Sequence, residues 1–141
     1  MAKDNIHPRR AARQCVLEAL FAYQFSKNDT IDQLLSKNPG LKENYGFIKS
    51  LFDFVLKNMK WTEDIIKSNL ENWEIDRVAQ IDKILLKMGI CEIYFIDNIP
   101  PKVTITEMVE IAKIYSTDES PVFINGILDA VFKNHIKENK E

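Results

Sequence analysis

The chain has 141 residues, of which 45% are hydrophobic and 28% are charged, and its formal net charge at pH 7 is −2. This length and balance are typical of one globular domain with a full core, so they exclude a largely disordered chain. The negative net charge argues against binding of nucleic acid through bulk charge, so any RNA-binding surface must be local.

Apolar residues recur at steps of three and four along nearly the whole chain, which predicts helices throughout. A first helix is expected at residues 8–25, because Pro8 suits the first helical position. Its core stripe consists of Ala12, Cys15, Val16, Ala19, Leu20 and Tyr23. A short helix is expected at residues 31–37, with Asp29 or Thr30 as its N-cap.

The Asn-Pro-Gly stretch at residues 38–40 should end that short helix. A third helix is then expected at residues 43–59. Thr62 is a candidate N-cap for a fourth helix that ends near Asn72.

The next expected helix, residues 78–96 with an irregular start at 74–77, is the longest and most apolar. A helix that is apolar on most sides usually lies at the centre of a fold. Gly89 costs this helix about 1 kcal/mol relative to Ala, and we interpret it as a close helix crossing rather than a flexible hinge.

Two further helices follow a proline-rich stop. The first is expected at residues 103–115, where Thr104 and Glu107 have capping-box spacing, or it starts earlier, after Pro101. The last, residues 120–135, opens with Ser-Pro, an N-cap followed by a proline at the first position.

These elements predict an all-α fold of about seven helices. We expect two small helical bundles packed as a single domain over residues 1–141, with a seam near 98–102. Residues 1–7 and 136–141 are expected to be frayed.

The residues of an enzyme active site are missing from the pattern. The two histidines, His7 and His135, lie near the chain ends and away from any metal-ligand spacing. The four glycines stand alone, so there is no phosphate-binding loop. Glu107 and Glu110 could pair, but a solvated helix face explains them more simply. We therefore expect no catalytic residue, no metal and no cofactor.

The sequence also bears on the compartment. No window approaches the ~20 apolar residues of a membrane span, and the N-terminus lacks the apolar run of a signal peptide. Cys15 and Cys91 lie in apolar helical stretches and are interpreted as reduced, buried thiols. A cytoplasmic protein is expected.

The first expected helix carries an unusual cluster of cations. Arg9, Arg10 and Arg13 lie in its first two turns, where each cation opposes the helix dipole by about 0.3–1 kcal/mol. A phosphate backbone is the simplest explanation. The face opposite the core stripe contains Arg10, Gln14, Leu17 and Phe21, with Arg13 at its edge. Arginines in line with an aromatic ring suit single-stranded RNA. The alternative is a solvated basic face, with Phe21 packed under a neighbouring helix.

The last expected helix carries a second candidate. Phe123 and Asn125 lie one or two turns from its N-terminus, where backbone N–H groups can bind anions. Asn125 could contact a base edge or a ribose. The alternative is that Asn125 and Gly126 serve helix packing alone.

Four segments, in this order and at these separations, resemble the bacterial NusB family: residues 9–21, 81–93, 99–113 and 120–129. The first holds Arg9-Arg10-x-x-Arg13-x-Cys15, and the second holds Lys87-x-Gly89. The last is the most specific stretch and reads Ser120-x-x-Phe123-Ile124-Asn125-Gly126-Ile127-Leu128-Asp129.

The resemblance implies an all-α fold of two small bundles and a role in transcription antitermination. A family member binds the boxA element of nascent RNA jointly with the ribosomal protein NusE, in a complex that lets RNA polymerase pass terminators. By this resemblance the RNA face comprises Arg9, Arg10, Arg13, Phe21, Lys87, Phe123 and Asn125. Asp76 and Asp82 would lie on the side that meets NusE.

Two other functions remain open from the sequence. The chain could be a NusB-like accessory module of the ribosomal RNA modification machinery, or a helical scaffold that binds only proteins. Phosphate contacts make affinity fall steeply with salt, which separates RNA binding from an apolar protein interface. The sequence also leaves open whether the chain forms a homodimer.

Overall fold

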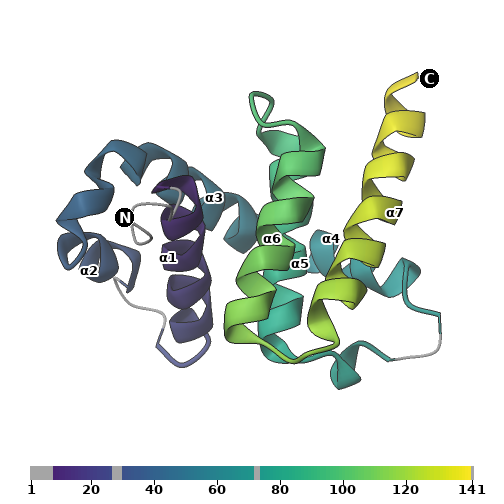
Figure 1. Ribbon diagram of the computed structural model, residues 1–141, viewed down its shortest axis with the longest axis horizontal. Coiled ribbons are helices and arrows are strands. Elements are labelled where there is room, and N and C mark those ends of the chain that lie inside the picture. Colours follow the sequence, from purple (N-terminus) through teal and green to yellow (C-terminus); the bar gives the residue numbers. More distant parts are fainter. Residues whose placement is uncertain (1–7, 27–29, 72–73, 141) are drawn as a thin grey trace. The chain divides into compact units, whose positions relative to one another are not determined.

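A computed structural model describes residues 8–26, 30–71 and 74–140 of the chain (Figure 1). Within these ranges the secondary structure is helical, which confirms the all-α fold. The helices are α1 (Pro8–Tyr23), α2 (Thr30–Ser36), η2 (Pro39–Asn44), α3 (Tyr45–Lys57), α4 (Met59–Ser68), η3 (Ile75–Arg77), α5 (Gln80–Phe95), α6 (Pro101–Tyr115) and α7 (Ser120–Lys140), where η marks a 3₁₀ helix. The segment 1–7 expected to be frayed and the candidate cap Asp29 lie outside the described residues. The fourth helix was expected to end near Asn72, but α4 ends at Ser68, so that expected end is wrong.

The chain divides into two compact units, Met1–Asp53 and Phe54–Glu141. The boundary therefore lies inside α3, and the seam expected near residues 98–102 is wrong. The physical reason is that α6 packs directly on α5 and α7, so the loop before α6 joins neighbours within one unit. We call Met1–Asp53 unit 1 and Phe54–Glu141 unit 2.

In unit 1, α1 packs against α2 and η2. The ring of Tyr23 meets that of Phe52 edge-on at 6.0 Å, and the Tyr45 hydroxyl donates a hydrogen bond of 2.6 Å to the Leu35 carbonyl. The predicted stripe of α1 is buried, with Tyr23 half-buried. Leu17, however, is only 1% exposed, so its expected place on an open face is wrong. The buried part of α1 is wider than one stripe.

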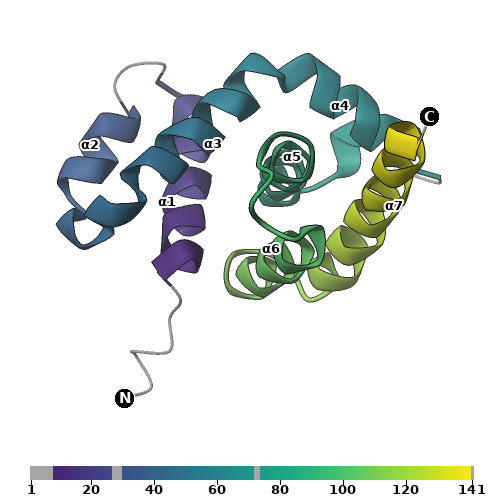
Figure 2. The same ribbon diagram turned by 90° about the horizontal axis from the view of Figure 1, so that it is seen from above.

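In unit 2, α5 lies at the centre, with α4, α6 and α7 packed around it (Figure 2). Its eleven buried residues form a nearly continuous run from Asp82 to Ile93, as the apolar pattern predicted. A Cβ added at Gly89 would lie 2.7 Å from Cδ1 of Leu128 on α7. The predicted close helix crossing at Gly89 is confirmed.

Two predicted helix caps are wrong because their hydroxyls have other partners. α4 begins at Met59, and the Thr62 hydroxyl donates to the Asn58 carbonyl at 2.8 Å from inside the helix. α6 begins after Pro100, which confirms the earlier of the two expected starts. Thr104 is buried there, and its hydroxyl donates to Oε1 of Glu92 at 2.9 Å.

Helix α7 continues to Lys140, beyond the expected end at His135. No helix formed by the described residues has both the length and the apolar character needed to cross a membrane. Cys15 and Cys91 are free thiols and are buried, as predicted. No group of three or more His, Cys, Asp or Glu side chains in the described ranges could hold a metal ion.

Candidate nucleic-acid interface

The arginines of α1 are organised around one aromatic ring. The guanidinium carbon of Arg9 lies 4.2 Å from the centroid of Phe47, and that of Arg13 lies 5.4 Å from it. Arg9 Nε also donates a hydrogen bond of 3.0 Å to Oδ1 of Asn44. Cation–π contacts of this kind contribute about 0.5–2 kcal/mol. The first turn of α1 contains no acidic residue. The ring of Phe47, which the sequence pattern did not single out, therefore fixes two cations near the start of α1.

Arg13 does not lie where the helical wheel predicted. It was expected at the edge of an open face, but it is 1% exposed. The side chain is long enough to lie along apolar surface and bring its guanidinium to Phe47. Arg9 and Arg10 are half-buried and keep part of their surface open to solvent.

The other end of α1 carries an exposed pair of aromatic rings. Phe21 is 38% exposed and Phe25, just beyond the helix, is 76% exposed. Their centroids are 5.5 Å apart with an interplanar angle of 62°, an edge-to-face arrangement. The alternative in which Phe21 is covered by a neighbouring helix is therefore wrong. The sequence could have indicated Phe25 through its four-residue spacing from Phe21.

Lys87 of α5 is a buried cation. It is 6% exposed, and its Nζ lies 4.0 Å from Sδ of Met59. Burial lowers the pKa of the Lys87 ammonium, and the negative charge of Glu63 opposes that effect. No salt bridge of Lys87 is found among the described residues. A buried ammonium without a carboxylate partner reduces stability, which is typical of residues kept for binding.

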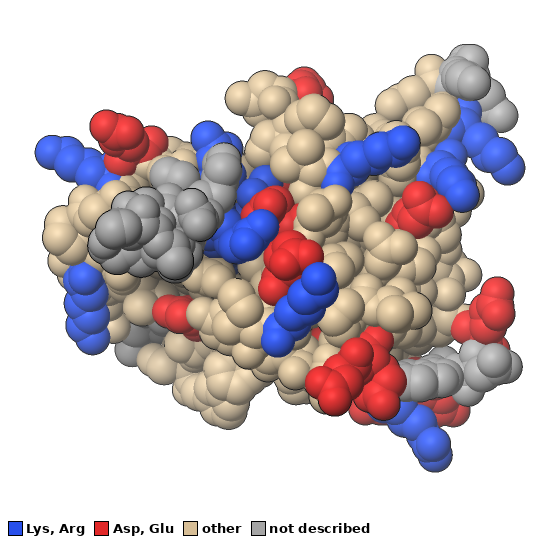
Figure 3. Space-filling model, viewed as in Figure 1, with Lys and Arg blue, Asp and Glu red and all other residues tan. Residues whose placement is uncertain are grey.

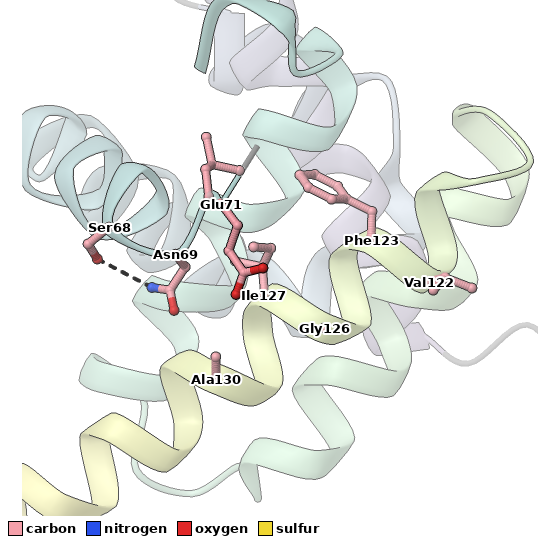
Figure 4. A pocket seen from close by; sticks show the side chains of 9 residues that line it. Ser68, Asn69, Glu71, Val122, Phe123, Gly126, Ile127 and Ala130 are labelled. Atoms are coloured by element: carbon pink, nitrogen blue, oxygen red, sulfur yellow. Dashed lines mark hydrogen bonds between the residues drawn. The ribbon is translucent and has the colours of Figure 1, made fainter. Parts of the chain in front are cut away.

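Phe123 and Asn125 lie in the first turns of α7, and Phe123 lines a pocket of about 480 Å³ (Figure 4). The pocket is lined by Ser68, Asn69, Leu70, Glu71, Val122, Phe123, Gly126, Ile127 and Ala130. Phe123 and Val122 leave α7 in different directions (Figure 4). Asn125 is exposed, and a Cβ added at Gly126 would meet nothing within 4 Å. The interpretation that Asn125 and Gly126 serve helix packing alone is therefore wrong.

The two aspartates expected on the partner side differ in their surroundings. Asp76 is exposed on η3. Asp82, in the first turn of α5, is 5% exposed. Its Oδ1 accepts from the Ser116 hydroxyl at 2.7 Å, and its Oδ2 accepts from the Ser120 hydroxyl at 2.8 Å. The Thr117 N–H donates to Oγ of Ser120 at 3.2 Å. Ser120 thus ties the start of α7 to α5, instead of capping α7 as predicted.

A second pocket of unit 2, of about 870 Å³, adjoins this network. It is lined by Arg77, Ala79, Asp82, Thr117, Asp118, Glu119, Ser120, Val122 and Phe123. Asp118 and Glu119 are exposed in the connection between α6 and α7. Figure 3 shows acidic side chains gathered where that connection lies in Figure 1. The surface around the start of α7 therefore combines carboxylates with exposed apolar groups.

The predicted site residues fall into separate groups. Unit 1 holds Arg9, Arg10, Arg13 and Phe21, all on α1, and unit 2 holds Lys87, Phe123, Asn125, Asp76 and Asp82. Within unit 1 the arginines gather at the start of α1 and the rings at its end. Within unit 2 Asp82 and Phe123 line one pocket. Spacing alone did not indicate Ser116 as a partner of Asp82.

The model of the NusB family matches residues 10–133 of the chain. The transcription antitermination protein NusB of Salinibacter ruber is 38% identical over 130 residues, which cover 87% of this chain and 79% of that protein. The structure of the T. maritima NusB is similar with a TM-score of 0.77 at 32% identity, covering 90% of this chain and 92% of that one. A crystal structure of the antitermination factors NusB and NusE in complex with dsRNA contains a chain of the same fold. Its TM-score is 0.79 at 22% identity, and it covers 90% of this chain and 97% of that one.

Proposed function

This chain belongs to the NusB family, and from that membership we propose that it is a transcription antitermination factor which binds boxA-type RNA jointly with the ribosomal protein NusE. In this role it is a cytoplasmic adaptor without a catalytic step, and its complex lets RNA polymerase pass terminators in ribosomal RNA operons. The observation that carries the proposal is the family match over residues 10–133, together with a relative of that name at 38% identity.

The proposed RNA surface of unit 1 follows α1. Arg9 and Arg10 supply charge for the phosphate backbone, and Phe21 supplies a ring on which a base can stack. Arg13 supports this surface from within, because it packs on the same Phe47 ring as Arg9. The absence of acids from the first turn of α1 favours a role in anion binding over one in helix stability.

In unit 2 we assign RNA contacts to Lys87, Phe123 and Asn125. The half-buried ring of Phe123 can stack, and the exposed amide of Asn125 can bond to a base edge or a ribose. Asp76 is exposed and can meet NusE directly. The proposed contribution of Asp82 is to fix the start of α7, since both its oxygens accept hydrogen bonds from serines.

The test is fluorescence anisotropy of a labelled boxA-type RNA with this protein, with and without NusE, across a salt series. Arg10→Ala is the variant to test, because Arg10 is only half-buried and its removal should change RNA binding more than folding. Arg13→Ala would remove a buried side chain and so could lower stability as well. Loss of one phosphate contact should weaken binding and reduce the slope of log K against log salt by about 0.7.

Lys133→Ala is the matched control, because Lys133 is an exposed cation of α7 whose salt bridge to Asp129 spans one helical turn. It should leave both the affinity and the salt slope unchanged. Absence of RNA binding with NusE present would contradict the proposal and favour the protein-binding scaffold. Equal losses in the Arg10 and Lys133 variants would contradict the assignment of RNA to α1.

A further inference from the structure

The exposed ring pair at the end of α1 extends beyond the residue assigned to RNA. We propose that Phe25 is a second base-stacking residue, which lengthens the RNA surface of α1 by one nucleotide beyond Phe21. This inference rests on the proposed function and deepens it, because it adds a residue that neither the sequence pattern nor the family resemblance singled out.

The geometry of the pair suits stacking of a base. Phe25 follows Phe21 by four residues, and its N–H donates to the Ala22 carbonyl at 3.0 Å, so the chain still follows a helical turn there. Residues four apart lie on the same side of a helix, about 6 Å apart along its axis. In an edge-to-face pair, only one face of one ring is covered. With 76% of its surface exposed, Phe25 keeps an open face for a base.

The composition of the surface favours nucleobases over a second protein. Among the described residues of unit 1, the exposed large apolar side chains are Phe21 and Phe25, and both are aromatic. At 38% and 76% exposure the two side chains present roughly 170–290 Å² of accessible surface in total. A stable protein interface needs about 800 Å² of surface from each partner. Base stacking needs only the flat face of a ring, and the charge for the phosphate backbone is supplied by the arginines at the other end of the same helix.

The experiment combines variants of Phe25 with an abasic scan of the RNA. The full chain and NusE are titrated with labelled boxA-type RNA, and with RNAs in which one nucleotide at a time keeps its backbone but lacks its base. Phe25→Leu and Phe25→Ala should each weaken binding of the intact RNA by about 5- to 150-fold. Phe25→Tyr keeps a ring and should bind like the unchanged protein.

One abasic position should lower the affinity of the unchanged protein but not that of Phe25→Ala, because the same contact is already lost. That position should neighbour the one that responds to Phe21→Ala. A merely structural role would not produce this pairing of one residue with one nucleotide. The melting temperature of each Phe25 variant should stay unchanged, because the side chain is largely exposed.

Three outcomes would overturn the inference. If Phe25→Ala and Phe25→Leu bind the intact RNA as the unchanged protein does, Phe25 does not stack, while the proposed function still holds. If Phe25→Ala alters self-association or NusE binding in the absence of RNA, the rings form a protein interface. If the unchanged protein with NusE binds no RNA at all, the inference and the proposed function fall together.

Discussion

The crossing of α5 and α7 at Gly89 allows a stability prediction with an internal control. Gly89→Ala would place a Cβ 2.7 Å from Cδ1 and 2.9 Å from Cδ2 of Leu128. Leu128 is 0% exposed, so its side chain has no open space into which it can turn. Gly126 also lies within a helix, α7, yet a Cβ added there would meet nothing within 4 Å. Gly126→Ala therefore reports the helix propensity without the steric effect.

The magnitudes follow from two opposing effects. Replacing a helical Gly by Ala stabilises by about 0.8–1.0 kcal/mol, and this applies to both positions. Overpacking of a filled core costs about 1–3 kcal/mol and applies to Gly89 alone. We expect Gly126→Ala to raise the free energy of unfolding by up to about 1 kcal/mol. Because the same gain in helix propensity applies to both variants, it cancels when they are compared. Gly89→Ala should therefore be less stable than Gly126→Ala by about 1–3 kcal/mol.

Urea denaturation followed by circular dichroism measures both variants, and the midpoints can be compared if the m-values agree. A double-mutant cycle with Leu128→Ala identifies the atoms responsible. Leu128→Ala alone should cost about 2–5 kcal/mol, but in the Gly89→Ala background it should cost less, because it also removes the clash. Equal stability of the Gly89 and Gly126 variants, or additive effects in the cycle, would refute the reasoning from the crossing.

Three other predictions concern buried groups. Ser120→Ala should lower the free energy of unfolding by about 1–3 kcal/mol, because the buried carboxylate of Asp82 loses a donor; an unchanged denaturation midpoint would contradict this. Lys87→Met should raise the denaturation midpoint at neutral pH and weaken RNA binding. Burial lowers the pKa of Lys87 below its unfolded value, so the free energy of unfolding of the unchanged protein should increase as the pH rises toward the ordinary lysine pKa. The difference in free energy of unfolding between Lys87→Met and the unchanged protein should therefore become smaller over that pH range. Burial raises the pKa of Cys91 to about 12 and also raises that of Cys15, so a thiol reagent at pH 8 should label neither until the protein unfolds; rapid labelling under native conditions would argue against this packing.

The sequence predicts the structure correctly where the pattern within a single helix determines the outcome. The apolar run of α5 predicted a central helix, and Gly89 within it predicted a close crossing. The same pattern was insufficient where a side chain has a partner far along the chain. The preference for acids near a helix start is enough to explain Asp82 from the sequence alone. Its hydrogen bond to Ser120 joins residues that are 38 positions apart, and no local pattern predicts such a pair. Arg13 was misplaced for a similar reason, since a helical wheel carries no information about Phe47.

The network at Asp82 also offers a physical connection between the two proposed binding activities. Ser116 and Ser120 hold the start of α7 against α5, and the next turns of α7 carry Phe123 and Asn125. A partner that binds beside this network can hold the first turn of α7 in one conformation. RNA binding then loses less conformational entropy at Phe123 and Asn125. By linkage, RNA would then strengthen partner binding by the same factor. Disrupting the network through Ser120→Ala should therefore reduce the enhancement by NusE more than it reduces RNA binding by the protein alone.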